Sequence, residues 1–237
     1  MQGFYETLFG RRDVRGEFTQ KPIPEDLLAR LIIAAHHAPS VGLSQPWNFI
    51  VIQRPQVKAA IHEAFCEAND EATAMFDRER QDKYRQLKLQ GILDSPVNLC
   101  ITCDRTRGGD VVLGRTHQPQ MDLYSTVCAV QNLWLAARAE DVGVGWVSII
   151  SPEKLAGILG LPDHVVPIAY LCLGYVEYFR HRPELEEKGW EKRRPADELV
   201  FTDQWGERGE GHAIYSGLAS QQDWPEQFIK AKRTSGD

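Results

Sequence analysis

Short apolar segments alternate with helical stretches along this chain of 237 residues, and this alternation constrains the fold more than any other feature. The apolar segments predict strands at 47–52, 97–102, 144–149 and 167–176, with a fifth candidate at 198–201. Apolar spacing and helix-starting residues predict helices at 3–10, 24–38, within 55–92, at about 120–140 and directly after 151–153. Strands that alternate with helices indicate an α/β or α+β domain built around a sheet.

The helix predicted at 120–140 is apolar on nearly all of its sides, with Leu123, Val127, Val130 and Trp134 among its residues. A helix of this character is buried on several sides. It is therefore either the central helix of the domain or part of a subunit interface.

Two other regions are far more polar. Residues 55–92 are highly charged and have few apolar anchors, of which Met75 and Tyr84 are two. This region is either a helical excursion that forms a lid over a site or a pair of solvated helices. Residues 207–237 are rich in glycine, serine and charge, so we expect a weakly ordered tail after one domain at 1–206.

Composition argues against several classes of protein. The net charge of −6 disfavours a general nucleic-acid-binding protein, because such proteins usually carry a basic surface. No stretch approaches the roughly 20 apolar residues of a membrane span, and the first ten residues lack a secretory pattern. The five cysteines, an odd number, fit free thiols in a reducing compartment. We therefore expect a cytoplasmic protein without nucleic-acid or membrane partners.

Three arginines and one aspartate stand together in the run Arg11, Arg12, Asp13, Val14 and Arg15. An arginine presents a rigid fork of donors that matches the oxygens of a phosphate. The alternative is a solvated basic turn whose arginines pair with nearby acids. Asp13 is harder to explain by that alternative, because it places a carboxylate beside the candidate anion site.

A second polar segment lies in the loop before the strand predicted at 47–52. It carries Ser40, Ser44, Gln45 and Asn48, which together offer donors and acceptors for the edge of a planar heterocycle. The alternative is an ordinary loop between a helix and a strand, with Trp47 in the core.

A third segment, at 142–148, contains Gly143 and Gly145 and ends at the hydroxyl of Ser148. The two glycines permit close backbone approach either to a ligand or to another strand. The alternative reading of Ser148 is a polar cap at the end of a packed strand.

The pair Cys100 and Cys103 does not predict a metal site. In a strand these side chains point to opposite faces, and no second cysteine pair stands at zinc spacing. We expect no metal. The glycine-rich signatures of dinucleotide- and nucleotide-binding loops are also absent.

In their order and spacing, the three segments resemble those of the nitroreductase-like flavoproteins. In that superfamily an arginine loop binds the phosphate and ribityl chain of FMN, and a Pro-Ser segment ending in Gln-Pro-Trp follows it. Arg193 best matches a late basic residue that completes the phosphate site. Asp13 departs from the pattern, because a serine is usual there. Longer motifs at 103–109, 114–117, 120–135 and 145–148 are similar to the BluB branch of the superfamily, over about residues 5–206.

The resemblance implies an α+β fold with a central mixed, mostly antiparallel sheet flanked by helices, and a helical lid at about 55–92. It also implies that reduced FMN is the substrate and molecular oxygen the co-substrate. The flavin is fragmented to 5,6-dimethylbenzimidazole and erythrose 4-phosphate, and the base becomes the lower ligand of cobalamin. Asp13 and Ser148 match the residues tied to fragmentation. The implied FMN-binding residues are Arg11, Arg12, Asp13, Val14, Arg15, Ser40, Gly42, Gln45, Trp47, Asn48, Met75, Ser148 and Arg193.

By the same resemblance we expect a homodimer with the flavin near the subunit boundary, and a separate NAD(P)H-dependent flavin reductase that supplies reduced FMN. Two alternatives stay open. One is a conventional nitro- or quinone reductase that keeps FMN bound and takes hydride from NAD(P)H. The other is a flavin-binding or storage protein without catalytic activity.

Overall fold

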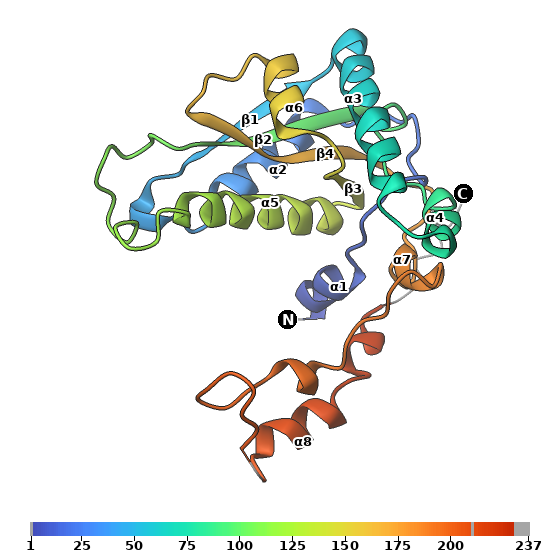
Figure 1. The fold of residues 1–237 in the computed structure, drawn as a ribbon, viewed down its shortest axis with the longest axis vertical. Coiled ribbons are helices and arrows are strands. Elements are labelled where there is room, and N and C mark those ends of the chain that lie inside the picture. Colours follow the sequence, from blue (N-terminus) through green and yellow to red (C-terminus); the bar gives the residue numbers. More distant parts are fainter. Residues whose placement is uncertain (1, 210, 230–237) are drawn as a thin grey trace.

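The computed structural model describes residues 2–209 and 211–229, which form a four-stranded sheet with helices on both faces (Figure 1). The strands are β1 (Trp47–Ile52), β2 (Val97–Asp104), β3 (Val142–Val147) and β4 (Val165–Tyr175). The α-helices are α1 (Gln2–Gly10), α2 (Glu25–His36), α3 (Pro55–Ala74), α4 (Arg78–Arg85), α5 (Met121–Ala139), α6 (Pro152–Leu159), α7 (Glu184–Glu187) and α8 (Ala213–Ser220). Three 3-10 turns are η1 (Val41–Leu43), η2 (Ala196–Leu199) and η3 (Trp224–Gln227).

The sheet has the order β1-β2-β4-β3, and every neighbouring pair of strands is antiparallel. In the described chain, parallel pairing occurs only at an isolated bridge between Asp13 and Val144. The predicted α+β class with a mostly antiparallel sheet is therefore confirmed, and its parallel element is this single bridge.

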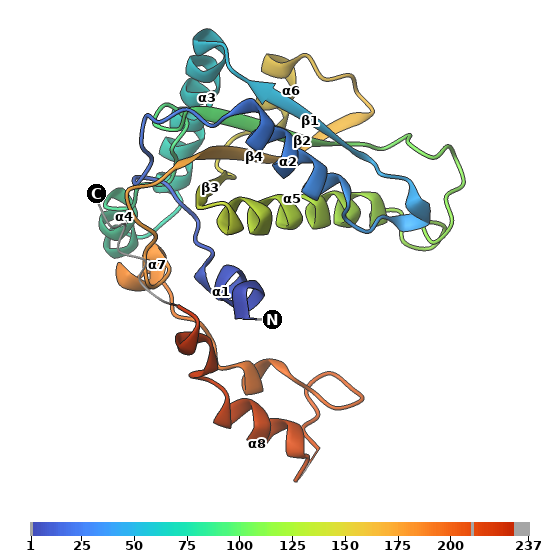
Figure 2. The ribbon, with the colours of Figure 1, turned by 180° about the vertical axis from the view of Figure 1, so that it is seen from behind.

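Each face of the sheet carries its own core. Leu99, Ile101 and Leu171 point to the face covered by α2 and α5, whereas Cys100 and Tyr170 point to the face covered by α3 and α6. The alternation follows from the two-residue period of a strand. Figures 1 and 2 show α2 and α5 together on one side of the sheet, and α3 and α6 on the other.

The predicted burial of the helix at 120–140 is confirmed along the side of α5 that packs on the sheet and on α2. Ala129, Val130 and Leu133 are fully buried there. The opposite side leaves Tyr124 52% and Val127 42% exposed. The helix is thus central to the domain and still presents an apolar outer face, so the second alternative, a subunit interface, stays open.

Two expected strand positions are wrong. β3 ends at Val147, because its pairing with β4 ends at Tyr170, and Ser148 therefore lies just beyond the strand. The fifth candidate at 198–201 overlaps η2 instead of forming a strand. Pro195 precedes this turn with a φ of −57°, and no neighbouring strand pairs with it in the described part of the chain.

The segment after residue 206 is more structured than its composition predicts. It contains α8, which projects from the body (Figure 2), and η3, which returns to α1. Aromatic side chains explain the return, since Trp224 and Phe228 pack on Tyr5 and Phe9. The last part of the predicted tail, 230–237, lies outside the described residues. Among the described helices, none has the length and apolar character to cross a membrane.

Candidate functional site

The arginine loop at 11–15 follows α1 and contacts the C-terminal half of α5. The indole of Trp134 donates a hydrogen bond to the carbonyl of Arg12 at 3.2 Å. Arg138 donates from Nε to the carbonyl of Gly10 at 3.1 Å, which ties the end of α1 to the same helix. The backbone of the loop is therefore fixed on both sides of Arg11.

Asp13 is held against the end of β3. Its Oδ1 accepts a hydrogen bond from the backbone N–H of Trp146 at 2.9 Å, and its Oδ2 accepts one from Arg15 Nη2 at 2.6 Å. Ser148 follows Trp146 by two residues and is exposed. The structure thus brings the carboxylate and the segment that carries the Ser148 hydroxyl to the same end of β3.

The two glycines of β3 make this approach possible. The N–H of Val14 bonds to the carbonyl of Val144 at 3.0 Å. A Cβ built on Gly145 would lie 2.0 Å from the carbonyl oxygen of Val14, and one on Gly143 would lie 2.4 Å from Val176 Cγ1. The sequence left open whether the glycines allow close approach of a ligand or of another chain segment. In the structure, other segments of the chain approach them, at Val14 and Val176.

Arg11, Arg12 and Arg193 form a group of like charges, here called the arginine cluster. Burial lowers the pKa of Arg11, and the charge of Arg193 lowers it further, although Asp13 opposes both effects. Burial first, and then the charges of Arg11, Arg193 and Arg138, lower the pKa of Arg12 to about 10, with Glu226 opposing them. Like charges gathered in this way attract an anion, as expected for the predicted phosphate site.

Unpaired donors support the same interpretation. Arg12 is 8% exposed and donates to the carbonyls of Phe9, Arg11 and His181, yet its Nε has no hydrogen-bond partner among the described residues. Nη1 of Arg15 is likewise buried and unpaired within the described chain. Buried polar atoms are nearly always bonded in native proteins. These two donors therefore fit the oxygens of a bound ligand.

A cavity of about 190 Å³ opens beside Ser148. Its walls come from β3, α6 and β4, and they are mainly apolar: Trp146, Val147, Ile150, Leu155, Pro167 and Tyr170. An apolar hollow beside a lone hydroxyl suits the flat, apolar end of a heterocycle.

The loop at 40–48 lies at the other end of α5. Its backbone N–H at Val41 donates to Ser125 Oγ at 3.1 Å, near the start of the helix. Ser40 Oγ accepts the N–H of Gln45 at 3.0 Å, and Gly42 and Gln45 have positive φ values of 54° and 47°. The loop is therefore tightly shaped.

Two residues of this loop have internal partners. Trp47 is 3% exposed, and its indole N–H donates to His36 Nδ1 at 3.1 Å, so its side chain belongs to the core. Asn48 Oδ1 accepts from Arg107 at 2.7 Å, and its amide nitrogen donates to Thr102 at 3.3 Å. Ser44 Oγ, in contrast, is buried without a partner among the described residues.

One chain does not bring the two polar loops together. The arginine loop contacts α5 at Trp134 and Arg138, whereas the 40–48 loop contacts it at Ser125. Thirteen residues separate Ser125 from Arg138, which corresponds to about 20 Å along a helix. Sequence order alone gave no sign of this separation.

The charged region 55–92 folds as α3 and α4 and reaches the segment that carries Arg193. Phe76 and Tyr84 pack on Trp190 with ring centroids 5.4 and 6.1 Å apart. Met75, expected in the lid, directly follows α3 as its C-cap residue and is 83% exposed. The region is thus a helix pair docked three residues from Arg193, a place from which it could cover the arginine cluster.

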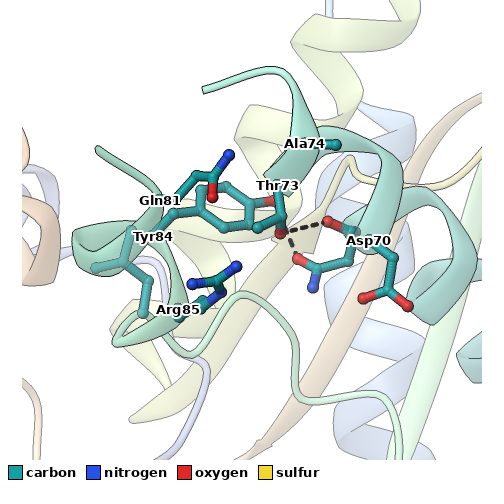
Figure 3. Close-up of a pocket in the computed structure, with 8 residues that line it drawn as sticks. Asp70, Thr73, Ala74, Gln81, Tyr84 and Arg85 are labelled. Carbon is teal, nitrogen blue, oxygen red and sulfur yellow. Dashed lines mark hydrogen bonds between the residues drawn. The ribbon is translucent and has the colours of Figure 1, made fainter. Parts of the chain in front are cut away.

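A cavity of about 450 Å³ lies between α3 and α4 (Figure 3). Asp70 and Thr73 line it from α3, and Gln81, Tyr84 and Arg85 line it from α4. Tyr84 donates to Asn69 Oδ1 at 3.0 Å, which joins the two helices. This polar cavity belongs to the helix pair itself and contains none of the predicted site residues.

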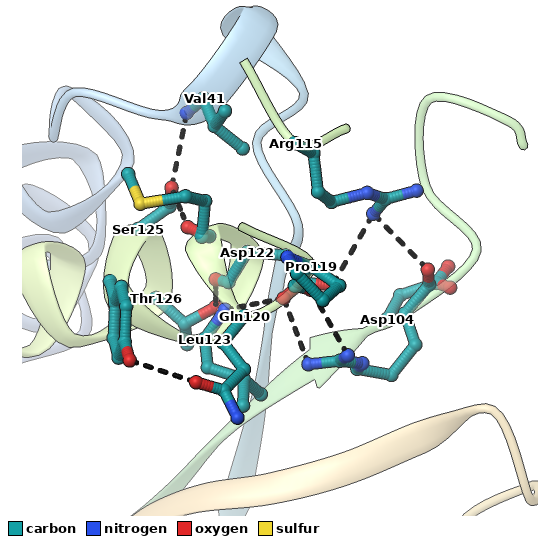
Figure 4. A network of polar contacts seen from close by, with 12 residues as sticks. Val41, Asp104, Arg115, Pro119, Gln120, Asp122, Leu123, Ser125 and Thr126 are labelled. Atoms are coloured by element: carbon teal, nitrogen blue, oxygen red, sulfur yellow. Dashed lines mark hydrogen bonds and ion pairs between the residues drawn. The ribbon is translucent and has the colours of Figure 1, made fainter. Parts of the chain in front are cut away.

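Asp122 is a residue whose role the sequence did not reveal. It is 1% exposed at the start of α5 and accepts from Arg105 at 2.8 Å and from Arg115 at 3.3 Å (Figure 4). The two arginines come from the loop at 104–119, which packs on the 40–48 loop: a Cβ on Gly42 would meet Leu113 O at 3.0 Å. Asp122 therefore shapes the second polar segment indirectly. The sequence signal that could have found it is an acid at the start of an apolar helix, preceded by a loop that contains Arg105 and Arg115.

Comparisons with known proteins identify the family of this chain. The profile of the nitroreductase family matches residues 8–175. A 5,6-dimethylbenzimidazole synthase of Rhodospirillum rubrum is 42% identical over 185 residues, which is 78% of this chain and 87% of that protein. A 5,6-dimethylbenzimidazole synthase of Rhodobacter capsulatus is 36% identical over 192 residues, 81% of this chain and 92% of that protein.

Solved structures show the same fold. A BluB-like flavoprotein from Clostridium difficile has a TM-score of 0.64 at 20% identity, with 84% of this chain and 98% of that chain covered. Iodotyrosine deiodinase bound to FMN and 3-iodo-L-tyrosine has a TM-score of 0.65 at 16% identity, with 85% of this chain and 98% of that chain covered. The fold, the family profile and the two synthases lead to one conclusion: this chain belongs to the nitroreductase family.

Proposed function

We propose that this protein is a 5,6-dimethylbenzimidazole synthase. Its substrate is reduced FMN, its co-substrate is molecular oxygen, and its products are 5,6-dimethylbenzimidazole and erythrose 4-phosphate. The base then serves cobalamin biosynthesis as a lower ligand. The two synthases that cover most of the chain at 42% and 36% identity support this function over that of a generic nitroreductase.

The observation that carries the proposal is the position of Asp13. The carboxylate lies beside the arginine cluster, is 30% exposed, and is oriented by both Trp146 N–H and Arg15. Cleavage of a carbon–carbon bond in the ribityl chain requires removal of a proton from a hydroxyl. A carboxylate next to that chain can accept the proton.

The residues of the site fit FMN. The arginine cluster and the unpaired donors of Arg12 and Arg15 suit the phosphate. The cavity beside Ser148 suits the flat ring system. When bound, reduced FMN supplies the electrons for the reaction with oxygen and the carbon skeleton of the product. Ser148 would then offer its hydroxyl to the ring edge and orient it.

The helix pair α3 and α4 would act as a lid. It docks on Trp190, close to Arg193, and the exposed Met75 at the end of α3 is free to cover a bound flavin. A closed lid keeps bulk water away from the reacting ring and strengthens the charge interactions beneath it.

We further propose that a second copy of the chain completes the site. Ser40, Gly42 and Gln45 lie at the opposite end of α5 from the arginine cluster, so in a symmetric dimer each loop can reach the flavin of the other subunit. The exposed apolar face of α5, with Tyr124 and Val127, offers a surface for such an interface. The protein would work in the cytoplasm with a separate NAD(P)H-dependent flavin reductase.

The test supplies reduced FMN in air and measures 5,6-dimethylbenzimidazole by mass spectrometry. Asp13→Ala and Ser148→Ala should each lower the rate at least about 100-fold, whereas the exposed controls Asp26→Ala and Ser220→Ala should retain it. Absence of the product with the unaltered protein contradicts the function. Wild-type rates in both site variants contradict the residue assignment alone. Direct oxidation of NAD(P)H by protein with permanently bound FMN would instead support the reductase alternative.

A further inference from the structure

The last described part of the chain packs on its first helix. Trp224 lies 4.8 Å from Tyr5 and 5.3 Å from Phe9, measured between ring centroids. Phe228 lies 5.5 and 5.8 Å from the same two rings. We call these four rings the aromatic clamp. It lies outside residues 8–175, the span matched by the family profile, at both of its C-terminal members and at Tyr5.

The helix α1 depends on such contacts. It has nine residues, and an isolated helix of that length is not stable in water. Its stability must come from packing of its apolar side on α5 and on Trp224 and Phe228. Each ring pair in the clamp adds attraction beyond simple burial.

The arginine loop directly follows this helix in the sequence. Gly10 is the last residue of α1, and Arg11 and Arg12 follow it immediately. Arg12 donates to the carbonyl of Phe9 in the last turn of α1 and to the carbonyl of Arg11, each at 2.7 Å. A shift of α1 would therefore move the backbone of Arg11 and the guanidinium group of Arg12.

A polar contact joins η3 to the same place. Glu226, which lies in η3 between Trp224 and Phe228, forms an ion pair with His181 at 3.3 Å when that histidine is protonated. The carbonyl of His181 accepts a hydrogen bond from Arg12 Nη2. The carboxylate of Glu226 is also close enough to Arg12 to influence its charge. The C-terminal segment thus contacts the arginine loop through α1 and through His181.

We propose that Trp224 and Phe228 are positioning residues for the phosphate of the flavin. By holding α1 in place, they fix the guanidinium groups of Arg11 and Arg12 where a phosphate monoester can accept their hydrogen bonds. This inference rests on the proposed function, because it assumes a flavin phosphate at the arginine cluster. The clamp does not touch the ring end of the site, beside Ser148.

We predict that variants of the clamp lose selectivity for FMN over riboflavin, while binding of the flavin ring is unchanged. Reduced FMN and reduced riboflavin, which lacks the phosphate, are titrated anaerobically by calorimetry against the full-length protein. The double variant Trp224→Ala, Phe228→Ala should weaken FMN binding about tenfold, as expected for loss of one charge-assisted hydrogen bond. Its riboflavin affinity should stay the same. Inorganic phosphate should compete with FMN for the unaltered protein and less effectively for the variant.

Trp205→Ala is the matched control, because Trp205 is also a tryptophan beyond the span of the family profile and is 90% exposed. It should leave both affinities unchanged. If the double variant does not fold, Trp224→Phe, which keeps an aromatic ring, should give a smaller loss of selectivity, about threefold.

The outcomes separate the two proposals. An unaltered protein that binds both flavins equally contradicts the phosphate site and hence the proposed function. An unaltered protein that prefers FMN, together with clamp variants that keep the same preference, contradicts the positioning role alone. Equal weakening of both flavins would mean that the clamp only stabilises the fold, which also contradicts that role.

Discussion

At the scale of single residues, Asp13 is where this sequence departs from the serine that the resemblance to nitroreductase-like flavoproteins predicts. A serine hydroxyl in that position could form a hydrogen bond to a ligand. It is neutral at neutral pH, however, whereas the carboxylate of Asp13 is negatively charged and can accept a proton. The fold supports the carboxylate with one backbone N–H and one guanidinium. It thus orients the group while leaving it 30% exposed to solvent.

The lowered pKa of Arg12 makes anion binding dependent on pH. We expect the guanidinium to be charged below about pH 10 and to lose its charge above it, before an exposed arginine would lose its own. FMN affinity should therefore fall roughly fivefold between pH 9 and pH 11, as expected for the loss of one nearby positive charge. Calorimetric titration across that range measures it.

Arg12→Gln is the control for this pH effect. Because glutamine carries no charge at any pH, its profile should be flatter and its affinity at pH 9 should already be low. A profile in the variant as steep as that of the unaltered protein would assign the pH dependence to another group.

At the scale of elements, the approach of the arginine loop to β3 is the critical contact. It depends on glycine, because the built Cβ of Gly145 lies 2.0 Å from a backbone oxygen that has no freedom to move aside. No local pattern in the sequence predicts that residues 13 and 144 pair, since 130 positions separate them. The glycines marked a close approach, but only the fold shows which segment approaches.

Gly145→Ala should separate the arginine loop from β3. We expect a cost of about 2–4 kcal/mol in the free energy of unfolding, seen as a fall in Tm of roughly 5–15 °C. Gly157→Ala is matched, because its Cβ meets nothing within 4 Å inside α6. That variant should gain about 0.5–1 kcal/mol. Equal Tm values for the two variants would show that the contact is not tight.

The sheet also predicts the reactivity of its thiols. Cys100, Cys103 and Cys172 are buried, and burial raises the pKa of Cys100 and Cys172 to about 12. Cys66 and Cys128 are exposed in the single chain, but Cys128 lies next to Val127 on the face of α5 that the proposed dimer covers. We therefore expect only Cys66 to react with a thiol reagent at pH 8 in the native dimer, because the reactive form is the thiolate. Mass spectrometry of the labelled protein identifies the sites, and denaturation should release the other four. Rapid native labelling of Cys100 would contradict the burial.

The sequence predicted the regular elements well where the signal is local. β1 and β2 follow from apolar runs, and α6 from Ser151, whose Oγ accepts the N–H of Lys154 at 3.2 Å. The end of β3 was misplaced because the chain stays apolar at Ile149 and Ile150, and only pairing with β4 sets the limit. The composition of residues 207–237 did not predict the aromatic clamp, because two aromatic residues barely change the mean hydropathy of a polar segment.

At the scale of the whole molecule, the site residues divide into two groups at opposite ends of α5. The three polar segments were treated as one site in the sequence, although the resemblance also implied a homodimer with the flavin near the subunit boundary. The proposed symmetric dimer would account for the separation, because its two-fold axis can place the 40–48 loop of each subunit at the arginine cluster of the other.

Subunit mixing tests this arrangement. Asp13→Ala and Gln45→Ala should each be nearly inactive as pure proteins. When the two are co-expressed at equal levels, half of the dimers are mixed, and a shared-site dimer then contains one intact site of its two. The preparation should recover about a quarter of wild-type synthesis of 5,6-dimethylbenzimidazole. If each site belonged to one chain, every site in the mixture would carry one of the two lesions, and no activity would return. Mixed dimers isolated through two different tags should show half of the wild-type rate, so that a failure to form them cannot be mistaken for an undivided site.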